Sequence, residues 1–346
     1  MKTTGLFGRK FIHLEERETE LGSPGFGEVI VKLNACGVCG TDLNFLKQWE
    51  GEPMPLGHEI AGEVVETGPE TPGIRVGDRV VLEDCSQCGI CADCKNGRTD
   101  LCRNMHTLND QSGMGRYMRV RHNNLVPFEG VPDQEACLTE PLSVCLNSVL
   151  AARIPFNGTV AVLGCGPLGL MTARIARLHG ASRVFVTEAD TRSVTGRARF
   201  DMARQWDFDE VIDTRSEDVE AVVKRHCPGG VDRVIVSSPP ESIYDALKII
   251  GYGGLITFFG LHFGGRNRIE VDINDLVFRK ITLQPYFAEP AVNFRVSLDL
   301  IRSGKVPVRD LISHTFTRSG AKAMFTDIIE GAQPVIKAVM LPQEDN

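Results

Sequence analysis

The sequence predicts an α/β protein with two domains, one β-rich and one built on a doubly wound parallel sheet. The chain has 346 residues, enough for two domains of ordinary size. Up to about residue 150, short β-branched runs are separated by glycine, proline or acidic turns. From about residue 155, strands alternate with helical stretches instead. That change of pattern indicates two domains of different class.

The β-rich part is expected to be a small antiparallel barrel or sandwich. Its clearest strands are expected at residues 27–34, 58–66 and 76–83. The tail adds a helix in VNFRVSLDLIRSG and a last strand in VIKAVML. We therefore assign residues 1–150, completed by 288–346, to this domain.

The second domain is expected to span residues 151–287. Its strands are expected at 160–164, 183–189, 210–214, 231–238, 253–260 and 281–287. Strand, helix and strand at this pitch indicate a parallel sheet with right-handed crossovers. The first helix is expected to bury Leu168, Met171, Ile175 and Leu178 and to end near Gly180.

Composition and charge exclude several classes of protein. The net charge of −7 argues against a nucleic-acid partner, which usually requires a basic face. No apolar run approaches the ~20 residues that cross a bilayer. The start, MKTTGLFGRKFIHLEERE, lacks the apolar core of a signal peptide. We expect a cytoplasmic, reducing location, where eleven cysteines serve metal binding, catalysis or burial.

Four cysteines lie close together in CGICADCKNGRTDLC. Cys88, Cys91, Cys94 and Cys102 offer four soft ligands with no open position, as a structural zinc ion requires. The alternative is a disulfide cluster, which a reducing compartment disfavours. Cys85 gives a second possible register, because CSQC is also Cys-x-x-Cys, and we interpret it as a spare thiol.

A strand, a glycine turn and a helix follow one another in VAVLGCGPLGLMTARIARLHGA. Gly164, Gly166 and Gly169 form G-x-G-x-x-G: the first allows a tight turn, the second lets the backbone approach a pyrophosphate, and the third lets helix and strand pack closely. The start of the helix, at Pro167 and Leu168, offers its N-terminus to the phosphates. The pattern predicts a Rossmann dinucleotide site.

The next strand ends in an acidic residue, Glu188. Its distance from Gly164 is close to the roughly 20-residue spacing of dinucleotide-binding units. A carboxylate here accepts hydrogen bonds from the ribose 2′-OH and repels a 2′-phosphate, so NAD is favoured over NADP. The alternative is a solvated strand end. Arg192 lies near enough to contact either cofactor.

A second group of metal-binding residue types lies in ACGVCGTDL and LGHEIAGEV. Taken singly, Cys39, His58 and Glu59 can be a buried thiol, a core histidine and a surface acid. Together they supply the mixed ligands of an open, catalytic zinc site. Glu140 in TEPLSV is a fourth candidate, although Pro141 after it is also typical of a carboxylate at a helix start.

Zinc beside a nicotinamide suits alcohol oxidation. The metal lowers the pKa of an alcohol, which then releases a hydride to the nicotinamide. The Thr41 hydroxyl is a candidate to pass the proton outward, or else a turn hydroxyl. Asp42 either orients His58 through its second ring nitrogen or forms a local Asx turn.

Six segments in this order resemble one family. They are GEVIVKLNACGVCGTDL, PLGHEIAGEVVETG, VGDRV, CGICADCKNGRTDLC, EPLSV and GCGPLG. With them the chain resembles a zinc-dependent medium-chain alcohol dehydrogenase, and the glutamate of EPL is typical of the sorbitol and threonine dehydrogenase branch. The resemblance implies a GroES-like catalytic domain interrupted by a Rossmann domain, with the active site in the cleft between them. It also implies a homodimer or homotetramer.

The resemblance also assigns roles to residues. It implies a catalytic zinc held by Cys39, His58, Glu59 and Glu140, and leaves open which glutamate binds at rest. It implies a structural zinc held by Cys88, Cys91, Cys94 and Cys102. Thr41 is similar to the family's proton-relay hydroxyl, and Phe259, Gly260 and Leu261 are similar to the segment along the nicotinamide. The cofactors are then two zinc ions per chain and NAD.

One departure from the family concerns proton transfer. Many members have a histidine five residues after the zinc-binding cysteine, where this chain has Asn44, which does not titrate near neutral pH. The expected activity is oxidation of a secondary alcohol of a polyol, sugar or cyclitol to a ketone, with NAD as acceptor. The partner is then a small-molecule alcohol, and neither nucleic acid nor membrane. The alternatives are a threonine-type hydroxy-amino acid dehydrogenase and a non-catalytic nucleotide-binding relative.

Overall fold

The structure is a computed structural model that describes residues 1–261 and 267–342. It divides into two compact units. Unit 1 contains Met1–Ser143, Glu289–Ala332 and Lys337–Asn346, and unit 2 contains Val144–Ala288 and Gln333–Ile336. The division falls within helix α4 (Thr139–Ala152). Among the described residues, every helix is too short or too polar to span a bilayer.

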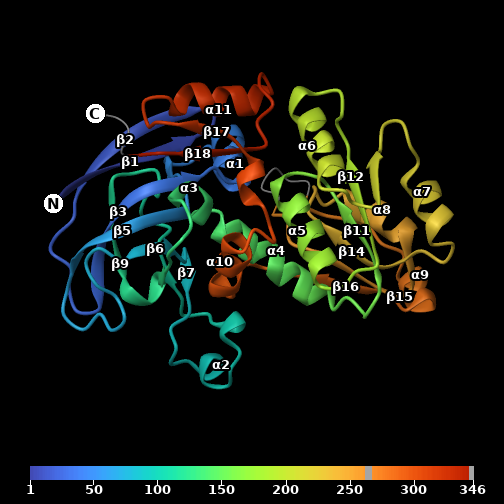
Figure 1. Cartoon of the computed structure of the whole chain (residues 1–346), viewed down its shortest axis with the longest axis horizontal. Coiled ribbons are helices and arrows are strands. Elements are labelled where there is room, and N and C mark those ends of the chain that lie inside the picture. Colours follow the sequence, from blue (N-terminus) through green and yellow to red (C-terminus); the bar gives the residue numbers. More distant parts are fainter. Residues whose placement is uncertain (262–266, 343–346) are drawn as a thin grey trace. The chain divides into compact units, whose positions relative to one another are not determined.

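The main sheet of unit 1 has seven strands, in the order β10-β6-β5-β3-β18-β17, with β9 also paired to β3. They are β3 (Glu28–Gly37), β5 (Glu59–Thr67), β6 (Arg79–Leu82), β9 (Tyr117–Arg121), β10 (Leu125–Pro127), β17 (Ile312–Phe316) and β18 (Lys337–Met340). All pairs are antiparallel except β17 with β18. The expected antiparallel domain is therefore present, and the chain's tail completes it (Figure 1).

Smaller elements surround this sheet. A second sheet has the order β2-β1-β4, and β7 pairs with β8. These strands are β1 (Lys2–Arg9), β2 (His13–Glu20), β4 (Met54–Pro55), β7 (Cys85–Ser86) and β8 (His106–Thr107). The helices of unit 1 are α1 (Gly40–Gln48), α2 (Ala92–Lys95), α3 (Asp133–Ala136), α10 (Phe294–Arg302) and α11 (Ala321–Glu330), with 3-10 turns η1 (Thr99–Leu101), η2 (His122–Asn124) and η3 (Val308–Leu311).

Unit 2 is built on a six-stranded sheet in which all pairs are parallel. Its strands are β11 (Thr159–Leu163), β12 (Arg183–Glu188), β13 (Glu210–Asp213), β14 (Val231–Val236), β15 (Ile250–Phe258) and β16 (Thr282–Pro285). The order is β13-β12-β11-β14-β15-β16. The first strand is central and the direction of winding reverses beside it, which is the doubly wound order of dinucleotide-binding sheets.

Helices cover both faces of this sheet, with α5 and α6 on one side and α7 and α8 on the other (Figure 1). The helices are α5 (Pro167–Leu178), α6 (Val194–Gln205), α7 (Val219–His226), α8 (Ser242–Ile249) and α9 (Ile273–Arg279). Helices α7 and α8 share one apolar core with the sheet. The predicted α/β architecture of the second domain is confirmed.

The buried face of α5 differs from the predicted stripe. Met171 and Ile175 are buried as expected, but Leu168 is half-buried and Leu178 is 42% exposed. The other buried residues are Leu170 and four small ones, Gly169, Thr172, Ala173 and Ala176. Small side chains let the helix lie close to the strands, so the large apolar residues alone were a poor guide.

The end of α5 agrees with the sequence. The predicted cap, Gly180, has φ +105°, a conformation that L side chains rarely adopt. Its N–H donates to the carbonyl of Arg177, so the helix ends here.

Candidate functional site

Four cysteine sulfurs converge in unit 1. The ligand atoms of Cys88, Cys91, Cys94 and Cys102 all lie within 4.8 Å of one another. The sulfur of Cys91 lies 3.4 Å from that of Cys94 and 3.9 Å from that of Cys102. A tetrahedral zinc ion with Zn–S bonds of about 2.3 Å places its sulfurs about 3.8 Å apart. The four residues therefore fit a closed structural zinc site.

The backbone around these cysteines stabilises thiolate. The N–H of Cys88 donates to the sulfur of Cys102, and the N–H of Cys91 donates to the sulfur of Cys88, both at 3.4 Å. The N–H groups of Ile90 and Cys91 lower the pKa of Cys88 to about 6. All eleven cysteines are free thiols, so the disulfide alternative is not what the structure has. Cys85 lies in a different group of side chains.

Cys39 and His58 meet at the start of α1. Cys39 is the N-cap residue of the helix, and its side chain is hydrogen-bonded to the imidazole of His58. Burial lowers the pKa of His58, but the Cys39 thiolate and the nearby carboxylates of Glu140 and Asp42 raise it, and the net shift is upward. The thiol and imidazole are thus placed to bind one ion.

Asp42 ties together the two segments that carry these residues. Its Oδ2 accepts a hydrogen bond from the N–H of Cys39 at 2.9 Å, and its Oδ1 accepts one from the N–H of Gly57 at 2.8 Å. Gly57 directly precedes His58. Because both oxygens bind backbone N–H groups, the structure has the local turn rather than a carboxylate bound to the second ring nitrogen.

Glu140 lies in the first turn of α4. Burial raises its pKa to about 8, and the His58 imidazole opposes that shift. Among the residues that the structure describes, no three of Cys39, His58, Glu59 and Glu140 bring their ligand atoms within 4.8 Å of one another. The structure brings Cys39 and His58 together, with Glu140 close by, and this donor set of thiolate, imidazole and carboxylate fits zinc.

Glu59, the remaining predicted ligand, forms an ion pair with a lysine. The Nζ of Lys337 donates to Oε1 of Glu59 at 2.6 Å and lies 2.6 Å from Oε2. Both side chains are buried, at 1% exposure for Glu59 and 6% for Lys337. Strands β5, β3 and β18 place them there, since Gly37 of β3 pairs with Glu59 on one side and Val339 on the other.

Sequence reasoning missed Lys337. A single lysine inside the apolar strand VIKAVML could have predicted the ion pair. A lysine that is buried in a sheet needs an anion beside it. Lys337 also donates to the carbonyl of Val38, at 2.8 Å, next to Cys39. Its ammonium therefore orders the backbone beside the predicted zinc ligand as well as the Glu59 carboxylate.

Two polar residues of α1 accompany Cys39. The Thr41 hydroxyl lies 3.8 Å from the Cys39 sulfur. Asn44 lies one turn further along the same helix and is half-buried. The hydroxyl predicted to pass a proton is therefore next to the predicted zinc ligand.

The glycine turn of unit 2 has the geometry that a dinucleotide needs. Gly164 has φ +104°, and a Cβ on Gly169 would lie 1.8 Å from the Gly164 carbonyl oxygen. A Cβ on Gly166 would meet nothing within 4 Å. The first and third glycines are thus required by the turn and by packing, whereas the second leaves open space beside the start of α5. That is where a pyrophosphate approaches in such turns.

Glu188 ends β12 near this turn and is 7% exposed. Its Oε2 accepts a hydrogen bond from the Cys165 thiol at 3.1 Å, and its Oε1 accepts one from the N–H of Asp190 at 2.9 Å. These contacts hold the carboxylate in place. Arg192 is exposed in the loop that follows.

The predicted nicotinamide segment follows β15. Phe259 is half-buried, whereas Gly260 and Leu261 are exposed. They lie just past the carboxyl end of a parallel strand, the edge at which ligands bind in doubly wound sheets. Their placement thus agrees with a cofactor role.

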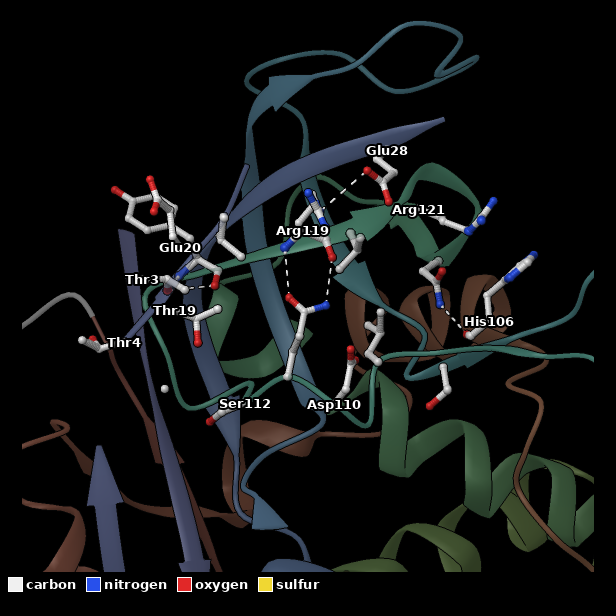
Figure 2. Close-up of a pocket in the computed structure, with 18 of the residues that line it drawn as sticks. Thr3, Thr4, Thr19, Glu20, Glu28, His106, Asp110, Ser112, Arg119 and Arg121 are labelled. Carbon is white, nitrogen blue, oxygen red and sulfur yellow. Dashed lines mark hydrogen bonds and ion pairs between the residues drawn. The ribbon is translucent and has the colours of Figure 1, made fainter. Parts of the chain in front are cut away.

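A pocket of about 510 Å³ lies elsewhere in unit 1 (Figure 2). Its walls include Glu28, His106 and Arg119, and the predicted zinc ligands do not line it. Arg119 lies 3.7 Å from the carboxylate of Glu28 and exchanges backbone hydrogen bonds with the Gln111 amide. Because Cys39, His58 and Glu140 are not among its lining residues, the pocket does not belong to the predicted site.

Comparison with known proteins agrees with this geometry. The alcohol dehydrogenase GroES-like domain family matches residues 25–133, and the zinc-binding dehydrogenase family matches residues 167–302. The L-threonine 3-dehydrogenase of Pyrococcus abyssi is 32% identical over 91% of this chain and 90% of its own. The sorbitol dehydrogenase of Halalkalibacterium halodurans is 29% identical over 95% of this chain and 96% of its own.

A solved structure extends the comparison. A putative zinc-binding dehydrogenase from Sinorhizobium meliloti 1021, bound to NADP, superposes with a TM-score of 0.85 at 27% identity, covering 99% of this chain and 100% of that one. The chain therefore belongs to the zinc-dependent medium-chain alcohol dehydrogenases. It is an oxidoreductase with zinc and a nicotinamide dinucleotide as cofactors.

Proposed function

We propose that this protein oxidises a secondary alcohol of an oxygen-rich small molecule, such as a polyol, sugar or cyclitol, to a ketone with NAD as hydride acceptor. The observation that carries the proposal is the contact of Cys39 with His58, with Glu140 close by. The similarity to a sorbitol dehydrogenase supports the polyol class. The similarity to L-threonine 3-dehydrogenases supports a second candidate, a hydroxy-amino acid.

We assign the catalytic zinc to Cys39, His58 and Glu140. A zinc ion there would supply a Lewis acid that lowers the pKa of the substrate hydroxyl. Glu59 is the fourth predicted ligand, but the Lys337 ammonium donates to its Oε1 and lies 2.6 Å from its Oε2. We therefore assign Glu59 to the buried ion pair and Glu140 to the ligand set.

The proton released by the substrate needs a path outward. Thr41 is positioned to accept it, because its hydroxyl lies 3.8 Å from the Cys39 sulfur. Asn44, in place of the histidine found in many relatives, does not accept a proton near neutral pH. The Thr41 hydroxyl would then pass the proton to water.

In unit 2 we assign the cofactor site to the glycine turn and its surroundings. Gly164, Gly166, Pro167, Leu168 and Gly169 form the pyrophosphate-binding turn. Glu188 accepts hydrogen bonds from the adenosine ribose, and the exposed Arg192 is the nearby cation. Phe259, Gly260 and Leu261 lie along the nicotinamide. Support comes from the open space at Gly166 and from the fixed carboxylate of Glu188.

We also propose a homo-oligomer, a dimer or tetramer, joined through the open edge of the parallel sheet. Strand β16 is at that edge, and Ile273, Val277 and Phe278 of the adjacent α9 are 64%, 66% and 75% exposed. An open strand edge beside exposed apolar side chains is typical of a contact surface. Light scattering of Phe278→Lys tests this, since the variant should dissociate. An unchanged mass would contradict the surface.

The free cysteines support a proposal about the cellular compartment of the protein. Cys88, Cys91, Cys94 and Cys102 bind zinc only when reduced, and all eleven cysteines are free. We therefore infer a reducing, cytoplasmic location.

The proposal is tested by adding polyols, sugars, cyclitols and hydroxy-amino acids to zinc-loaded protein with NAD and following NADH absorbance. Steady turnover of a secondary alcohol, lost in Cys39→Ala, is the expected result. The absence of turnover with every class, or turnover that survives in Cys39→Ala, would contradict it.

A further inference from the structure

The turn that is predicted to bind the pyrophosphate contains a buried cysteine. Cys165 lies between Gly164 and Gly166 and is 0% exposed. The glycine pattern places no demand on the residue type at this position. The role of this residue therefore depends on what its thiol contacts.

Two hydrogen bonds join this turn to the end of β12. The N–H of Gly164 donates to the Thr187 hydroxyl at 3.1 Å, and the Cys165 thiol donates to Oε2 of Glu188 at 3.1 Å. Thr187 and Glu188 are the last two residues of that strand. The segment expected at the pyrophosphate is thus connected directly to the acid expected at the adenosine ribose.

The thiol of Cys165 acts as a hydrogen-bond donor. Burial raises the pKa of Cys165, and the charge of Glu188 and the hydrogen bond to it raise that pKa further, so the thiol stays protonated at neutral pH. Glu188 is 7% exposed, so little water reaches its carboxylate to replace a donor that is lost. The thiol therefore helps to hold this carboxylate in one orientation.

The remaining acceptor positions of Glu188 suit a ribose. An ionised carboxylate has about four acceptor positions on its two oxygens. The Cys165 thiol occupies one on Oε2, and the N–H of Asp190 occupies one on Oε1 at 2.9 Å. These two contacts leave one position on each oxygen, which matches the two neighbouring hydroxyls of an adenosine ribose. A 2′-phosphate replaces one of these hydroxyls and adds negative charge, so an acid held in this orientation disfavours it.

We propose that Cys165 is a positioning residue that sets the preference for NAD over NADP by orienting the Glu188 carboxylate. The inference rests on the proposed function, because it takes Glu188 as the residue that binds the adenosine ribose. It adds a residue to which neither the glycine pattern nor the acid after β12 assigns a role. The thiol acts through Glu188 rather than on the cofactor itself.

The cofactor affinities of Cys165→Ala test this role. The alanine methyl group donates no hydrogen bond, so the carboxylate is held less firmly. The ratio of the dissociation constant for NADP to that for NAD, measured by calorimetry, should fall about three- to tenfold, the usual effect of one hydrogen bond. A general distortion of the turn would weaken both cofactors equally, because both present the same pyrophosphate. An unchanged ratio would therefore overturn the proposal.

Further variants locate the effect in the hydrogen bond. Cys165→Ser should return the ratio close to the parent value, because a hydroxyl again donates to Glu188. If Cys165→Ala fails to fold, Cys165→Val, which is close to cysteine in size and has no donor, carries the test. The matched control is Cys227→Ala, because Cys227 follows α7 and precedes β14, at the opposite edge of the sheet from the glycine turn. A fall of equal size in Cys165→Ser or in Cys227→Ala would overturn the proposal.

A double-variant cycle tests whether Cys165 acts through Glu188. In a Glu188→Ala background, Cys165→Ala should leave the ratio where Glu188→Ala has already placed it, because the group that the thiol orients is gone. A further fall as large as in the parent would show that the two residues act independently, and would overturn the proposal.

These binding measurements need no alcohol, so they separate the positioning role from the proposed function. A parent protein that prefers NAD and loses that preference in Cys165→Ala, yet oxidises no alcohol, would support the role of Cys165 while the proposed function fell. Alcohol oxidation with NAD, together with an unchanged ratio in Cys165→Ala, would overturn the role of Cys165 and leave the proposed function in place.

Discussion

The ammonium of Lys337 lies 2.6 Å from both carboxylate oxygens of Glu59, and the pair is buried in the sheet of unit 1. Glu59 directly follows His58, and Lys337 donates to the carbonyl that precedes Cys39. The ion pair therefore supports the backbone on both sides of the predicted metal site. It also engages Glu59, which the family resemblance implied as a zinc ligand.

Replacing Lys337 by methionine should strongly destabilise the protein. The Glu59 carboxylate would stay buried without a counter-ion, and breaking such a pair costs roughly 3–5 kcal/mol of unfolding free energy. Urea unfolding of Lys337→Met measures this. The double variant Glu59→Gln with Lys337→Met should recover much of the loss, since no charge is then buried alone. A single variant as stable as the parent would contradict the account.

The ion pair of Glu59 with Lys337 also predicts how the free energy of unfolding depends on pH. Burial is the largest single effect and lowers the pKa of Lys337, but Glu59, Cys39 and Cys137 together raise it by more, so the folded value lies above the unfolded 10.5. The stability contributed by the lysine is thus complete below the unfolded value and is lost as pH rises through the folded one. The difference in unfolding free energy between parent and double variant should shrink only in that alkaline range.

Two glycines of the same turn should respond in opposite ways to alanine. Gly166→Ala places its Cβ in open space, so stability should be nearly unchanged, but the methyl group obstructs a pyrophosphate and NAD binding should weaken at least tenfold. Gly169→Ala puts a Cβ 1.8 Å from the Gly164 carbonyl, so the strand and helix must separate and unit 2 loses stability. Thermal melting and calorimetry with NAD distinguish the two, and a reversed order of effects would contradict the structure.

Glu188 should discriminate between the two nicotinamide cofactors. Removing its carboxylate in Glu188→Ala deletes hydrogen bonds to the ribose, so NAD affinity should fall roughly tenfold or more, while NADP affinity stays equal or rises. Isothermal titration with each cofactor gives the ratio. Equal affinity of the parent protein for NAD and NADP would show that this carboxylate does not select the cofactor.

Cys94→Ser should remove the structural zinc and make the segment of residues 88–102 less ordered. A hydroxyl is a poor zinc ligand, and the segment of residues 88–102 contains only the short elements α2 and η1. Limited proteolysis should cut the variant within this segment. Cys227→Ser is the matched control, because Cys227 is a free thiol of unit 2 that belongs to neither predicted zinc site. This variant should keep the zinc content of the parent protein. A fully loaded and protease-resistant Cys94→Ser would refute a structural zinc here.

Regular hydrophobic patterning explains which parts of the fold were predictable. The central strands of unit 2, β11, β12 and β14, are buried runs rich in valine, so they were found from the sequence. The hairpin of β1 with β2 was not, because β2 reads HLEERETE and is largely exposed, without the apolar alternation that marks a strand. Likewise, Leu178 was expected to be buried but is exposed at the last residue of α5, where the helix ends.

The residues of the candidate site also fall into those that the sequence could predict and those that it could not. Cys88 to Cys102 and the glycine turn are local motifs whose spacing determines their geometry. Glu59 and Lys337 come from distant parts of the chain, and only the pairing of β5, β3 and β18 brings them together. Long-range charge complementarity of this kind leaves no local spacing to detect.

Zinc content measured together with turnover tests the central claim most directly. Elemental analysis of the purified, unchelated parent should give two zinc ions per chain, and Cys39→Ala should keep one while losing NADH formation. The same zinc content in both proteins, or alcohol oxidation that persists in Cys39→Ala, would contradict a catalytic metal held by Cys39 and His58.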